Sequence, residues 1–393
     1  MRSFSSVLSI VLSLGLITVP LTASAQVMMT TSGQKVQNSQ NGYTQFTPNP
    51  QKSTRINYDT WDSLLEEMVL YSGPSDRRRM STPQAITGSL IVRGHKSAYR
   101  LEGNRIPYSQ IAKDFAQYIT EYRRDLEEIG TRVDISSLAK NEQLAFWLNL
   151  HNVAIIEQIS KAYPLKRPNA EKISSPPTLL NDAKILKINN TPLSLRDIRE
   201  KIVYPNWKNP KVIYGFYLGD IGSPSIQNTA FTADNLSDVL DRSAIEFTNS
   251  LRGFQVRGKK QYVSKIYQEV APFYFPNFDE DIYNHVRKYM RDDVKSQLNN
   301  APFDIDRYDS IITDLTGGQG VYKSISPMSS VSGPIAKNGG RSNLDQYIQE
   351  LVIKRKRLER EGLITRGTVI IEDIETNDGP YVPAPDIDIE TDN

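Results

Sequence analysis

The residues of this chain that could do chemistry fall into two groups, and the first lies in a loop near the middle of the sequence. Asp220, Ser223 and Ser225 offer a carboxylate and two hydroxyls within six positions. A serine nucleophile needs a base within hydrogen-bond reach and donors for the developing oxyanion, and the sequence around Ser223 suggests neither. We therefore interpret Ser223 as a turn residue beside Pro224, with serine catalysis as the alternative.

The second group lies in residues 141–156, a stretch so apolar on all sides that it predicts a buried helix. Helical geometry places Glu142 and Asn149 on nearly the same line, with Asn152 close to it. Buried amides must be hydrogen-bonded, so they either tie the helix to neighbouring loop backbone or face a ligand, and the first alternative is the more common. A candidate groove for a ligand or partner accordingly comprises Glu142, Asn149, Asn152, Asp220, Ser223 and Ser225.

Other kinds of chemistry are disfavoured by composition. The chain has no cysteine, which excludes a thiol nucleophile and a thiolate metal site. It has 3 histidines, at positions 95, 151 and 285, and we predict no metal site and no cofactor. With 47 basic and 45 acidic residues the net charge is +2, so we expect no nucleic-acid partner.

The elements that must position these residues can be predicted from hydrophobic spacing. The loop follows the strongest strand candidate, residues 211–218, which we expect at the centre of a sheet, and precedes a helix capped by Thr232. Further helices are predicted near residues 61–69, 111–129 and 282–290, a short strand at residues 89–92, and a hairpin over residues 254–263. Helices early and strands later predict an α+β fold: a single main domain with a central β-sheet packed by several helices.

The two ends of the chain read differently from the middle. Residues 1–25 have a basic start, an apolar core and the small-residue pattern Ala23-Ser24-Ala25, which predicts a cleaved signal peptide; the alternative is an uncleaved anchor. We thus expect export to the periplasm or the exterior, with no membrane span after cleavage. Residues 26–55 read as a disordered polar linker, residues 319–341 as a second linker, residues 342–371 as a helix and short strand, and residues 372–393 as an acidic disordered tail. The helix should pack on the main domain or on one partner helix.

The sequence of the buried helix also resembles a known family. The run from Glu142 to Asn152 is similar to the signature helix of the domain of unknown function 547 family. Stretches at residues 58–65, 193–198, 230–236, 264–267 and 307–310 resemble other parts of the family in the same order. The resemblance covers roughly residues 56–318, which we take as the main domain.

The resemblance also shows what this chain lacks. The family typically carries a histidine, an Asn-Cys pair and a Gly-Cys-Pro turn, where this chain has Ile213, Tyr217-Leu218 and Gly222-Ser223-Pro224. It implies a fold distantly related to papain or transglutaminase, with thiol chemistry that this chain cannot perform. We therefore expect a non-catalytic binding or assembly module of the cell envelope, with an envelope protein, peptide or glycan as partner. The alternative is a hydrolase or transferase acting on envelope peptides or glycans through Ser223.

Overall fold

The computed structural model describes residues 42–82, 94–111, 113–320 and 343–365. The chain divides into two units, Met1–Thr44 and Gln45–Asn393, and the elements discussed below lie in the second, except for Thr44 at the start of a short 3-10 helix. The predicted signal peptide and acidic tail, and the short strands expected at residues 89–92 and 369–371, lie outside the described residues.

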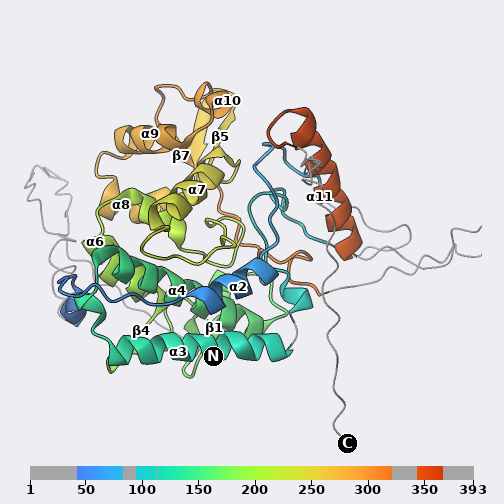
Figure 1. Cartoon of the computed structure of the whole chain (residues 1–393). Coiled ribbons are helices and arrows are strands. Elements are labelled where there is room, and N and C mark those ends of the chain that lie inside the picture. The colour runs from blue at the N-terminus through green and yellow to red at the C-terminus, as the bar shows by residue number, and fades with distance from the viewer. Residues whose placement is uncertain (1–41, 83–93, 112, 321–342, 366–393) are drawn as a thin grey trace, which may run out of the picture. The chain divides into compact units, whose positions relative to one another are not determined.

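The second unit combines many helices with a few short strands, so the predicted α+β class is confirmed (Figure 1). The α-helices are α2 (Asp59–Met68), α3 (Lys113–Arg132), α4 (Lys140–Ala162), α5 (Leu195–Asp197), α6 (Tyr204–Asn206), α7 (Leu236–Asn249), α8 (Lys265–Tyr274), α9 (Phe278–Tyr289), α10 (Asp292–Lys295) and α11 (Asn343–Arg360). The strands are β1 (Lys172–Ile173), β2 (Thr178–Leu179), β3 (Leu186–Ile188), β4 (Thr191–Leu193), β5 (Phe254–Arg257), β6 (Lys260–Val263) and β7 (Phe303–Ile305). Short 3-10 helices are η1 (Thr44–Phe46), η2 (Tyr108–Gln110), η3 (Ile135–Ser137), η4 (Pro168–Ala170) and η6 (Pro210–Gly215), and η5 (Ile198–Val203) is a π-helical turn. Of the helices in the described ranges, none has both the length and the apolar character that a bilayer crossing requires.

Helix α4 forms the core, as its apolar sequence predicts. Every side chain from residue 142 to residue 157 is buried, and Phe146 and Trp147 are completely inaccessible. The long amphipathic helix α3 packs along α4, and the two lie side by side in Figure 1. Because α4 is enclosed on all sides, each of its polar side chains must find a partner inside the protein.

The predicted central strand is wrong. Residues 210–215 form the 3-10 helix η6, and the chain continues in an extended conformation without pairing to another strand. The helix starts where Asn209 accepts a hydrogen bond from the Lys211 N–H, and Gly215 lets it approach α4 closely, because a Cβ there would lie 2.8 Å from the Leu148 side chain. The Asn152 side chain donates to the Gly215 carbonyl and accepts from the Tyr217 N–H. It thus satisfies backbone groups that a neighbouring strand would otherwise pair with.

The strands form three small sheets instead of one central sheet. Two are the hairpins β1–β2 and β3–β4, and the third has the order β5-β6-β7. The predicted hairpin over residues 254–263 is confirmed as β5 and β6, which turn at Gly258 with φ +61° and pair antiparallel. Strand β7 adds to β6 in parallel. Among the described residues, no sheet exceeds these three strands.

The C-terminal helix α11 packs on the loops that precede α3, so of the two alternatives for this helix the main domain is its partner. Tyr347 packs with Leu101 and Leu315 in a small buried cluster. Glu350 forms a salt bridge with Arg100, at 2.7 Å, and Lys354 donates to the Leu101 carbonyl at 2.7 Å. Lys354 is thus a buried basic residue that connects α11 to the main domain.

Part of the polar segment 26–55 lies against the domain. The backbone N–H groups of Asn49 and Gln51 donate to the carbonyls of Ser136 and Ser137, at 2.8 and 2.7 Å. Phe46, one of the few apolar residues of this segment, is buried with its ring 5.2 Å from that of Trp147. The folded part thus includes residues whose composition alone resembles that of a linker.

Candidate functional site

The polar residues of α4 serve as clamps on neighbouring backbone. The Asn149 side chain donates to the Phe231 carbonyl at 2.7 Å and accepts from the Phe231 N–H at 3.1 Å. Asn152 likewise donates to the Gly215 carbonyl and accepts from the Tyr217 N–H. Glu142 accepts from the Ile56 N–H at 3.0 Å. These bonds agree with the scaffolding alternative, because each amide uses one N–H group and its oxygen on neighbouring backbone.

The loop after residue 218 is held with Ser223 turned inward. It begins at Gly219, whose φ of +85° would strain any other residue. A Cβ there would lie 2.2 Å from the Ile159 side chain of α4 and would displace it. The Ser223 side chain is fully buried, donates to the Asp220 carbonyl at 2.8 Å and accepts from the Leu218 N–H at 3.3 Å. Among the described residues its partners are all backbone groups, so no base is in reach of its hydroxyl.

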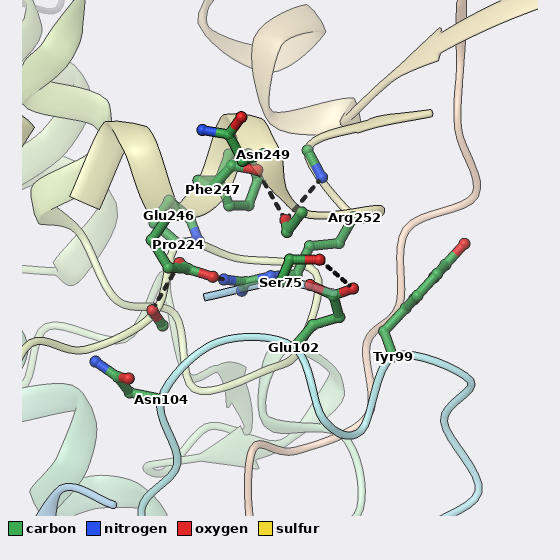
Figure 2. Close-up of polar contacts among 12 residues, drawn as sticks. Ser75, Tyr99, Glu102, Asn104, Pro224, Glu246, Phe247, Asn249 and Arg252 are labelled. Carbon is green, nitrogen blue, oxygen red and sulfur yellow. Dashed lines mark hydrogen bonds and ion pairs between the residues drawn. The ribbon is translucent and has the colours of Figure 1, made fainter. Parts of the chain in front are cut away.

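Arg252 also holds the loop that contains Ser223. Arg252 donates to the carbonyls of Ile221 and Ser223. It also forms an ion pair with Glu246 (Figure 2). Glu246 in turn accepts from the Ser225 hydroxyl at 2.8 Å. The hydroxyls of Ser223 and Ser225 are therefore both used to hold the loop, and the six predicted site residues do not converge on one groove.

A cavity of about 390 Å³ lies on the other side of this loop. Ile213, Leu218 and Pro224 line it, and the first two stand where the family resemblance places a histidine and a cysteine. Helix α8, seen beside α7 in Figure 1, contributes Ile266 and Val270. The remaining lining residues are Asn169, Leu179, Asn181, Asp182, Arg196, Arg199, Glu200, Tyr204, Phe216, Lys265, Glu269, Tyr308 and Ser310.

A continuous chain of hydrogen bonds follows the wall of the cavity. The Tyr308 hydroxyl donates to one oxygen of Asp220 at 2.6 Å, and the Asn169 amide donates to the other. Asn181 donates to Asn169, and Arg199 donates to Asn181 at 3.1 Å. We call these residues the polar relay. Of its members only Asp220 was singled out in the sequence, although Tyr308 lies in a stretch that resembles the family.

Asp220 is the relay's buried acid. It is completely inaccessible, and burial raises the pKa of its carboxyl to about 8 even though the bonds from Tyr308 and Asn169 act in the opposite direction. Near neutral pH the carboxyl is therefore mostly protonated. It does not face Ser223 as a base, because its two oxygens are occupied by Tyr308 and Asn169.

His151 contacts Arg199, the last residue of the polar relay. Arg199 Nη1 lies 2.8 Å from His151 Nε2, and since a guanidinium can only donate, that ring nitrogen accepts. The ring proton then resides on Nδ1, 3.2 Å from the Asn152 side-chain oxygen. Burial, with the Arg199 charge second, holds the pKa of His151 well below its usual range. His151 is thus a neutral support for Arg199 and not a member of the cavity wall.

The other two histidines lie elsewhere in the domain. His95 is buried and contacts the Ile312 carbonyl at 3.2 Å, whereas His285 is half-buried and contacts the Tyr214 hydroxyl at 2.8 Å. Removal from water lowers the pKa of His95 to about 3 and that of His285 to about 4. Within the described ranges no group of three or more histidine and acidic side chains is arranged to hold a metal ion.

Comparison with known proteins matches part of this site to a family. Searches of curated proteins and of solved structures gave no match. Residues 135–248, from η3 to α7, match the model described as "Protein of unknown function, DUF547". This span contains α4, the loop at Ser223 and the relay residues Asn169, Asn181, Arg199 and Asp220. The chain therefore carries a domain of the DUF547 family.

Proposed function

We propose that this protein is a non-catalytic binding module whose ligand occupies the cavity beside the polar relay. The observation that supports this most directly is that Ile213 and Leu218 both line the cavity. The resemblance assigns these positions to a histidine and a cysteine, so apolar side chains stand where a base and a nucleophile would face a substrate. A concave, partly apolar site with a few fixed polar groups is the usual form of a ligand-binding site.

Catalysis through Ser223 has less support. A serine nucleophile needs an accessible hydroxyl and a base within hydrogen-bond reach. Ser223 is fully buried and is not among the residues that line the cavity. Its hydroxyl is hydrogen-bonded to backbone groups. Asp220, the nearest acid in the sequence, is bonded through its side chain to Tyr308 and Asn169.

The proposal includes a place of action outside the cytoplasm, where the partner would be an envelope protein, peptide or glycan. It rests on the signal pattern of residues 1–25, with small residues at Ala23 and Ala25. N-terminal sequencing of the protein recovered from the periplasm or medium should begin at Gln26. Recovery of the intact chain from the cytoplasm alone would contradict export.

The binding site can be tested with a neutral apolar probe, N-phenyl-1-naphthylamine, whose fluorescence rises in apolar surroundings. We expect saturable binding to the mature chain that weakens at least about tenfold in Leu218→Trp, because the larger side chain enters the cavity. Ile353→Trp is the matched control, since Ile353 is an exposed residue of α11 outside the cavity. Absence of saturable binding, or equal affinity of Leu218→Trp and the parent protein, would count against the proposed site.

A further inference from the structure

One cation of the cavity wall differs from the others. Arg196 pairs with Asp182 and with Glu200, at 2.5 and 3.1 Å, and Lys265 pairs with Glu269 at 3.1 Å. Arg199, which is only 7% exposed, has no carboxylate oxygen within 4.0 Å among the described residues. A buried charge without a partner is costly, so an unpaired guanidinium on a cavity wall favours an anion from outside.

The hydrogen bonds of Arg199 leave one edge of its guanidinium available. Nη1 uses its two N–H groups on His151 and Asn181, at 2.8 and 3.1 Å. The N–H groups of Nε and Nη2 find no hydrogen-bond partner in the described part of the chain. Nε and Nη2 form the side-on edge that binds the two oxygens of a carboxylate in parallel.

The guanidinium is also fixed in place before any ligand arrives. His151, neutral and itself held by Asn152, supports Nη1 from behind, and Asn181 supports it from the relay. Arg199 lies on the π-helical turn η5, a type of distortion often found at functional sites. Burial lowers the pKa of Arg199, but a guanidinium keeps its proton near neutral pH.

The rest of the cavity suits an apolar body. Beyond Arg199 and the relay, Ile213, Leu218, Ile266 and Val270 contribute apolar side chains to the wall. The wall's acids do not oppose an anion strongly, because each is paired with Arg196 or Lys265 at partly exposed positions where solvent screens charge.

We propose that the cavity binds an amphiphilic carboxylic acid, whose carboxylate pairs side-on with Nε and Nη2 of Arg199 while its apolar body lies over Ile213, Leu218 and Val270. This inference rests on the proposed binding function and adds the chemical class of the ligand. The carboxylate could belong to a free organic acid or to the C-terminus of a peptide.

Matched acid and amide probes test the inference on the unmodified mature chain. We expect 1-naphthaleneacetate to bind at least about tenfold more tightly than 1-naphthaleneacetamide by isothermal titration calorimetry, because the amide cannot pair with the guanidinium. An N-acetylated dipeptide with a free C-terminus, compared with its C-terminal amide, forms the second arm. Tighter binding of the dipeptide acid than of naphthaleneacetate assigns the site to chain ends, and the reverse assigns it to free acids.

Variants connect the preference to Arg199. Arg199→Lys keeps the positive charge but loses the pair of N–H donors on Nε and Nη2, so the preference for the acid over the amide should fall at least about fivefold. The neutral probe N-phenyl-1-naphthylamine should still bind. Arg196→Lys, a paired cation of the same wall, is the control and should keep the preference. Equal affinity for acid and amide in the unmodified protein, or a preference that survives Arg199→Lys, overturns the inference. If either of these results is found but N-phenyl-1-naphthylamine still binds and its binding weakens in Leu218→Trp, the carboxylate inference fails and the proposed binding function stands.

Discussion

At the scale of single residues, Asp220 shows how burial can outweigh hydrogen bonding. The Tyr308 hydroxyl and the Asn169 amide both favour the ionised carboxylate, yet the pKa of Asp220 is raised to about 8 because removal from water disfavours the charge more strongly. In the unfolded chain the same carboxyl ionises near its ordinary pKa. Between these two values the folded protein holds more protons, so the contribution of Asp220 to stability is full at low pH and is lost as the pH rises toward 8.

Replacing this acid should remove that dependence. In the parent protein the Asp220 contribution to the free energy of unfolding should fall by up to about 1.4 kcal/mol per pH unit between about pH 5 and 8. In urea unfolding across this range, Asp220→Asn should therefore gain stability relative to the parent as the pH rises. Asp238→Asn, at an exposed position of α7, should run parallel to the parent. Parallel profiles for Asp220→Asn and the parent would mean that Asp220 is ionised in the folded state.

Sequence reasoning found the buried polar residues of α4 but not the partners that decide their roles. Asn149 bonds to Phe231, which lies far along the chain, and periodicity within a helix carries no information about such a contact. Arg199 was missed because its neighbours Arg196 and Glu200 make the segment look like a solvated helix surface. The π-helical turn η5 changes which side chains share a face, and spacing rules for an α-helix cannot anticipate it.

At the scale of elements, α11 is attached through a buried cation. Lys354 is 1% exposed, and its ammonium donates to the Leu101 carbonyl at 2.7 Å. Burial lowers the pKa of Lys354, while the nearby acids Glu102 and Asp76 act against the shift. The Lys354 ammonium therefore contacts groups of the loops that precede α3, and we expect it to help hold α11 in position.

Substitution of Lys354 tests this attachment. Lys354→Met keeps the length of the side chain but leaves the Leu101 carbonyl unbonded, so we expect a loss of about 1–3 kcal/mol in the free energy of unfolding and faster proteolysis within α11. Lys356→Met removes the same kind of charge from an exposed position two residues away, and should change stability by less than about 0.5 kcal/mol. Equal behaviour of the two variants would show that α11 does not rely on the buried ammonium.

The elements predicted correctly are those whose signals are local. The hairpin β5–β6 follows from two β-prone runs around Gly258, and α4 follows from a long apolar stretch. The strand expected at residues 211–218 fails because its apolar residues are buried against α4 and α7 instead of being paired in a sheet. Asn152 supplies the backbone partners there, and a strand pattern cannot reveal that a side chain will do so.

At the scale of the whole molecule, the sequence predicted an α+β domain but not the way its titratable groups are distributed. All 3 histidines of the chain have a lowered pKa: about 3 for His95, about 4 for His285 and well below the usual value for His151. Each therefore favours the neutral form in the folded protein, whereas the unfolded chain would protonate it below its ordinary pKa of about 6.5. The unfolded state binds more protons there, so this contribution to stability is lost as the pH falls.

Acid should therefore weaken the fold in the range where exposed histidines titrate. Glu102, Glu142 and Asp220 have raised pKa values and offset part of the effect, because they bind protons in the folded state. We expect a net uptake of protons on unfolding near pH 5.5, measured from the pH dependence of urea unfolding. His285→Gln should reduce the uptake by about one proton, since glutamine keeps a hydrogen-bonding group beside Tyr214 without titrating. An uptake that is unchanged in His285→Gln would mean that His285 takes up its proton in the folded protein as well.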